Sequence, residues 1–75
     1  MSYIKSEKEL DLHKVRHDDV NRLVENFVLL NETPLNIITG NSTMMRELVV
    51  EVLEKHKFVY ENLISQSVIT VLGDK

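Results

Sequence analysis

Cysteine is absent from the 75 residues of this chain, which excludes disulfides and thiolate metal sites. Aromatic residues make up only 5% of the sequence, so we expect a core of Leu, Val and Ile. No apolar run approaches the roughly 20 residues of a membrane-spanning helix, and no signal-peptide pattern is present. The sequence therefore predicts a single cytoplasmic domain that has no membrane partner.

Positive charge is also scarce, since 9 Lys and Arg face 12 Asp and Glu and the net charge is −3. A protein that holds nucleic acid through a broad basic surface should be clearly positive. Any phosphate binding must therefore depend on a small local cluster. Of the two glycines, Gly40 stands alone and builds neither a GxGxxG nucleotide loop nor a Walker motif.

The residues that are present alternate between strand and helix patterns. Apolar residues at three- and four-residue spacing predict one helix from about Asp18 to the Thr33-Pro34 pair and another over about 43–57. Residues 1–7 read as a flexible lead-in. Short alternating or β-branched runs predict strands at 8–13, 35–38, 58–64 and 68–72. Residues 73–75 are expected to form a tail.

This order predicts an α/β fold, namely strand-helix-strand-helix-strand-strand in one domain. Right-handed crossovers make the first two strands parallel, and two helices on one face give a two-layer sandwich with a mixed four-stranded sheet. In open α/β sheets, ligands bind beyond the carboxyl ends of parallel strands. The loops at 13–18 and 39–43 both leave from that edge.

A first candidate cluster follows the first strand. Asp11 and His13 share a strand face, so the carboxylate could orient the imidazole and raise its basicity. A histidine held in this way serves as a general base or a phosphate contact. Lys14, Arg16 and His17 add positive charge directly after it. The alternative is a solvent-facing polar pair on an uncovered sheet face.

A second candidate cluster lies at the turn from strand to helix around Gly40. One of Asn41, Ser42 and Thr43 is expected to cap the helix, whose N-terminal N–H groups suit a phosphate. The alternative is an ordinary strand–turn–helix junction, which needs a glycine and a cap in any case.

Arg46 extends this second cluster. If it folds back over the helix N-terminus, it adds a bidentate phosphate donor. Otherwise it is a surface arginine that pairs with Glu47 or Glu51. We expect no cofactor, since a metal at His13 and His17 would need a third ligand from Asp18 or Asp19.

The two clusters together resemble the Smr (small MutS-related) domain family. Leu-Asp-Leu-His at 10–13 is similar to its first motif, and Ile-Ile-Thr-Gly at 37–40 leads into its second. The likeness covers about residues 8–72. It implies a two-layer α/β sandwich, similar to the C-terminal domain of translation initiation factor three. It also implies DNA or RNA binding, and several members of the family are endonucleases or ribonucleases.

Carried over by position, the resemblance makes Asp11 and His13 the catalytic candidates. It also implies phosphate contacts at Thr39, at Gly40 and at Arg46, the arginine that follows the second motif. Some family glycines are replaced: Lys14 and Ser42 stand where the motifs have Gly, and the loop at 65–67 lacks glycine. A loop with few glycines approaches a backbone less closely, so binding is expected more firmly than cleavage.

The sequence thus predicts a small Smr-like domain that binds DNA or RNA through a phosphate site at the sheet edge. Whether the domain also has endonuclease activity is left open by the sequence. The alternative is a protein-interaction module that kept the fold and uses an exposed apolar sheet face with Phe58 or Tyr60. A third reading is a small nucleotide phosphohydrolase. The expected phosphate-binding residues are Lys14, Arg16, His17, Thr39, Gly40, Asn41, Ser42 and Arg46.

Overall fold

The computed structural model describes residues 8–74, which form a four-stranded sheet and two α-helices. The expected lead-in at 1–7 lies outside the described residues. The order of elements confirms the predicted strand-helix-strand-helix-strand-strand succession. In chain order they are β1 (Lys8–Asp11), α1 (His17–Leu30), β2 (Leu35–Ile38), α2 (Thr43–Lys55), β3 (Phe58–Leu63), the short 3-10 helix η1 (Ile64–Gln66) and β4 (Val68–Asp74).

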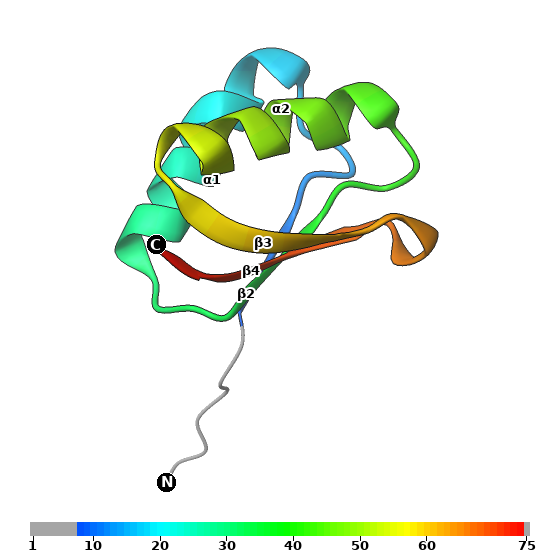
Figure 1. Cartoon of the computed structure of the whole chain (residues 1–75). Coiled ribbons are helices and arrows are strands. Elements are labelled where there is room, and N and C mark those ends of the chain that lie inside the picture. The colour runs from blue at the N-terminus through cyan, green and yellow to red at the C-terminus, as the bar shows by residue number, and fades with distance from the viewer. Residues whose placement is uncertain (1–7, 75) are drawn as a thin grey trace, which may run out of the picture.

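The sheet has the strand order β1-β2-β4-β3. β1 and β2 are parallel, whereas β4 runs antiparallel to both of its neighbours, β2 and β3. Both helices lie on the same face of this sheet (Figure 1) and pack against each other. The predicted two-layer α/β sandwich with a mixed sheet is therefore confirmed.

The core lies between the helices and this face of the sheet. Each helix turns one apolar stripe inward, as the three- and four-residue spacing predicted. The inward side chains of β2 and β4 alternate with outward ones, which is the period of a strand with one covered face. The buried members are Val20, Val24, Val28, Met45, Val49, Val52 and Leu53 from the helices, and Leu35, Ile37, Ile69 and Val71 from the sheet.

The first strand is shorter than predicted, because it ends at Asp11 and not at His13. Leu12 still donates its main-chain N–H to the carbonyl of Ile38 at 2.9 Å, and its side chain is fully buried. The Leu12 carbonyl then accepts from Val15 N at 3.1 Å, which turns the chain out of the sheet. His13 therefore lies in a turn above the strand.

The elements near the C-terminus also end differently. α2 stops at Lys55 and not near Lys57, since Lys57 has a φ of 64°, the left-handed conformation that ends many helices. Gly73 and Asp74 were expected in a tail but belong to β4, where they pair with the start of β3. The longer hairpin continues the sheet to the end of the described chain.

The second sheet face carries no helix among the described residues. Phe58 or Tyr60 was expected on this face, but both pack against the core and Tyr60 pairs with the buried Val71, so that expectation is wrong. The exposed large apolar side chains of β3 and β4 are Val59, which is 40% exposed, and Leu72, which is 47% exposed.

The described chain enters and leaves the sheet at one end. Lys8, the first residue of β1, pairs with Leu35, and Leu35 pairs with Val71 close to the end of β4. The loops that follow β1 and β2 leave from the other end. This arrangement separates both ends of the described chain from those loops (Figure 1).

We expect Leu53→Ala to lower the free energy of unfolding by about 2–5 kcal/mol, because it leaves a cavity in a core that fully buries this side chain. Urea denaturation measures the change. Leu30→Ala is the matched control, since Leu30 is 78% exposed and its truncation should change stability by no more than about 0.5 kcal/mol. Equal losses in both variants would contradict the packing described here.

The phenol of Tyr60 donates a 2.7 Å hydrogen bond to the Glu54 carboxylate. This bond raises the pKa of Tyr60 above its ordinary value of 10.0, with smaller contributions from burial and from the negative charge of Glu54. The neutral phenol is the form that stabilises the fold. Its contribution is therefore complete below the unfolded pKa and is lost as the pH rises through the raised one.

Ultraviolet titration of tyrosinate tests this expectation. Tyr60→Phe identifies the signal of Tyr60, since the sequence has only one other tyrosine, Tyr3. Glu54→Ala should bring the titration of Tyr60 to lower pH, toward the ordinary value. An unchanged titration in Glu54→Ala would show that the hydrogen bond does not raise the pKa.

Candidate nucleic-acid interface

Three loops meet at the edge of the sheet beyond the carboxyl ends of β1 and β2. They comprise residues 12–16, residues 39–42 and the β3–β4 connection at 64–67 (Figure 1). Ser67 joins two of them, because its carbonyl accepts the main-chain N–H groups of Thr39 at 2.9 Å and Gly40 at 3.3 Å. The edge is therefore held together by main-chain hydrogen bonds.

The turn after β2 has the geometry that its sequence predicted. Gly40 has a φ of 70°, which a side chain rarely tolerates. Of the three candidate caps, Ser42 takes the position, and its hydroxyl accepts the N–H of Met45 at 3.0 Å. Asn41 accepts a 2.8 Å hydrogen bond from the Ser67 hydroxyl. The N-terminus of α2 is thus fixed at the edge.

Thr39 has a different role from the predicted phosphate contact. Its side chain is 3% exposed, and its hydroxyl lies 3.2 Å from the carbonyl of Ser67 and 3.1 Å from that of Gly40, to which it donates. This hydroxyl holds the turn to the β3–β4 hairpin. In this arrangement it faces main-chain carbonyls and contributes to the site by shaping it.

Arg46 folds back beneath the start of α2 and is only 9% exposed. The interpretation of Arg46 as a surface residue paired with Glu47 or Glu51 is therefore wrong. Its Nη2 donates to the Gly40 carbonyl at 3.2 Å, and its Nε is buried with no hydrogen-bond partner. Within residues 8–74 the carboxylates in contact with a basic side chain are Asp19, with Arg22, and Glu25, with His56, so no carboxylate forms an ion pair with the guanidinium of Arg46.

The first cluster lies on the neighbouring loop and is exposed. The Asp11 carboxylate accepts the main-chain N–H of His13 at 2.8 Å, so it holds the turn and not the imidazole. Lys14, Arg16 and His17 are also exposed, and Arg16 occupies the N-cap position of α1 without a side-chain capping bond. The structure thus brings these basic residues to the edge but leaves the histidine ring unoriented by Asp11.

No group of three or more His, Asp or Glu side chains within residues 8–74 is arranged to hold a metal ion. His13 and His17 therefore do not combine with Asp18 or Asp19 into such a group. In the same part of the chain, no helix has both the length and the apolar character needed to cross a membrane.

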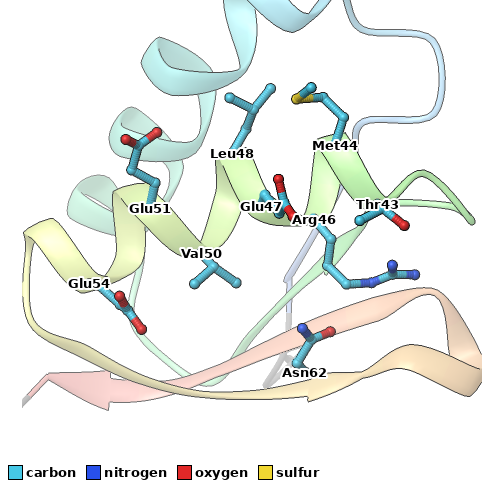
Figure 2. Close-up of a pocket in the computed structure, with 9 residues that line it drawn as sticks. All are labelled: Thr43, Met44, Arg46, Glu47, Leu48, Val50, Glu51, Glu54 and Asn62. Atoms are coloured by element: carbon cyan, nitrogen blue, oxygen red, sulfur yellow. The ribbon is translucent and has the colours of Figure 1, made fainter.

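A groove of about 790 Å³ lies over α2 on the side of the edge strand β3. Figure 2 shows Arg46, Val50 and Glu54 projecting from α2 toward Asn62 of β3, with Thr43 above the guanidinium. Glu47 and Glu51 also line it. The groove therefore has one buried cation near the N-terminus of α2, three carboxylates along the helix, and the apolar side chains of Met44, Leu48 and Val50 among them.

Ser67 was missed as a site residue. The sequence indicated only a short polar loop at 65–67, whereas Ser67 has a φ of 59° and contacts Thr39, Gly40 and Asn41. A serine in a left-handed turn has no distinct sequence pattern. Ser67 could have been found only from the pairing of β2 with β4, which places the β3–β4 loop beside the turn at Gly40.

We expect Ser42→Ala to lower the free energy of unfolding by about 1 kcal/mol, because the N–H of Met45 loses the cap that satisfies it. Thermal and urea denaturation measure the loss, and Ser42→Asp should keep most of the stability. Ser65→Ala makes the same chemical change at an exposed position and should have little effect. A loss in Ser65→Ala as large as in Ser42→Ala would argue against the cap.

Comparison with known proteins adds no relative: no protein-family model matches the sequence, and no curated protein and no solved structure is significantly similar to it.

Proposed function

We propose that this chain is a small nucleic-acid-binding domain that contacts phosphates of DNA or RNA at the edge where the three loops meet. The observation that carries the proposal is Arg46, a residue that is 9% exposed and whose guanidinium lacks a carboxylate partner within residues 8–74. It lies beside the N-terminus of α2, where backbone N–H groups and the helix dipole also favour an anion.

Exposed basic residues on the adjacent loop support the same proposal. β1 and β2 are parallel neighbours, so the loop with Lys14, Arg16 and His17 leaves the sheet beside the loop that leads to α2. Lys14 and Arg16 lie there close in sequence to Asp11, Asp18 and Asp19, so positive charge is confined to a few side chains in a chain whose net charge is −3. This distribution of charge fits a contact with a few phosphates and not a wide electrostatic footprint.

The resemblance to the Smr family points to the same activity, since its members bind DNA or RNA and share the strand and helix order found here. We propose that the domain works in the cytoplasm. Cleavage is a weaker proposal than binding, because the Asp11 carboxylate bonds the main chain of His13 and does not orient its ring. His13 is the residue to test as a general base.

Fluorescence anisotropy with a labelled RNA hairpin and a labelled DNA duplex tests this function. We expect binding that weakens with salt, with a slope that corresponds to about one to three phosphate contacts. Arg16→Ala should weaken binding and lower that slope by about one, because one phosphate contact is lost. Lys55→Ala is the matched control, since it removes one exposed positive charge from the opposite end of α2.

Equal effects of Arg16→Ala and Lys55→Ala would indicate only the general charge of the protein and would contradict a local site. Denaturing gels of the same substrates report cleavage, which His13→Ala should abolish if the imidazole takes part. Absence of binding at low salt would reject the function. It would favour a protein-interaction module, for which the exposed side chains of Val59 and Leu72 on the open sheet face are the supporting observation.

A further inference from the structure

The charge of Arg46 is buried, and no carboxylate of the described residues forms an ion pair with it. Within residues 8–74 its Nε has no partner, and its hydrogen bond uses Nη2 and the carbonyl of Gly40. Desolvating a cation is costly unless it is paired and its donors are satisfied. An anion bound against the guanidinium would relieve this cost, and Arg46 lines the groove from which such an anion would arrive.

The approach to Arg46 is bordered by neutral donors. Figure 2 shows the guanidinium lying beneath Thr43, the first residue of α2, with the side chain of Asn62 facing it from β3. The side chains of Thr43 and Asn62 are exposed, so a hydroxyl and an amide are available on either side of the groove.

The charges around the groove give a bound polyanion a direction. Beyond Arg46 the groove is lined by Glu47, Glu51 and Glu54, which repel a continuing phosphate backbone. On the other side of the α2 N-terminus lies the loop with the exposed residues Lys14 and Arg16. A nucleic-acid strand that reaches Arg46 is therefore repelled along α2 and attracted toward this loop, and a strand whose last phosphate lies at Arg46 avoids the acidic residues altogether.

We propose that the groove at Arg46 binds a terminal phosphate of a nucleic-acid strand whose body extends toward the loop of Lys14 and Arg16. This inference rests on the proposed nucleic-acid binding and specifies its ligand. A terminal phosphate monoester carries a charge of about −1.5 to −2 at neutral pH and three acceptor oxygens, more than a diester within the strand. Since Nε is buried and Nη2 also donates to the Gly40 carbonyl, the guanidinium would bind such a group through Nη1 and the second N–H of Nη2.

Competition anisotropy with short single-stranded RNA tests the proposal. The competitors share one sequence and carry a 5′-phosphate, a 3′-phosphate or hydroxyls at both ends. We expect a phosphate at one of the two ends to strengthen binding about tenfold, the effect of one charge-assisted contact. Arg46→Gln should remove this preference, and Arg46→Lys should reduce it, because lysine keeps the charge but loses the fork.

Arg46 also donates a hydrogen bond to the Gly40 carbonyl, so substitutions of Arg46 can disturb this turn. A second variant is therefore needed that changes the charge of the groove and leaves the turn intact. Glu47→Gln meets this need, because Glu47 is exposed and lines the groove. Glu47→Gln should improve binding of the competitor with two hydroxyl ends. The difference in affinity between phosphorylated and hydroxyl-ended RNA should therefore become smaller. Glu32→Gln makes the same charge change at an exposed position after α1 and should leave the preference unchanged.

Each result separates the inference from the function on which it rests. Equal binding of phosphorylated and hydroxyl-ended RNA by the unmodified protein would overturn the inference and leave nucleic-acid binding in place. A preference that persists in folded Arg46→Gln would also overturn it, since the terminal phosphate would then be bound elsewhere. Failure of every oligonucleotide to bind would overturn the proposed function and the inference with it.

Discussion

The candidate interface depends on one carbonyl, that of Ser67. It accepts the N–H groups of Thr39 and Gly40 and lies within hydrogen-bond distance of the Thr39 hydroxyl. These bonds attach the turn after β2 to the β3–β4 hairpin. The same turn supplies the Gly40 carbonyl, which accepts a hydrogen bond from Arg46. The position of the buried cation is therefore set by contacts between two turns far apart in the sequence.

The order of strands and helices could be predicted because each element carries its own periodic pattern. Valines at four-residue spacing mark the buried face of α1, and the apolar run after Pro34 marks β2. The ends were less accurate for a physical reason. Lys57 ends α2 through a left-handed conformation, and Gly73 stays in β4 because β3 pairs with it, and neither constraint is local to the pattern.

The sequence predicted which residues of the turn after β2 lie close together, but not the contacts that they make. The sequence indicated that Thr39, Asn41 and Ser42 gather near Arg46, since a strand, a glycine and a helix cap define that turn. It did not reveal that Thr39 is used internally or that Asp11 bonds the main chain of His13. Those outcomes depend on which acceptor or donor lies within about 3 Å, and folding alone determines this.

Both ends of the described chain lie at the end of the sheet away from the three loops, because Lys8 begins β1 there and Asp74 finishes β4 there. A fluorophore, a surface linker or a fused protein attached at either end would therefore be held away from the interface. The domain is suited to immobilisation or to display in tandem, since its edge of converging loops stays accessible in both orientations of attachment.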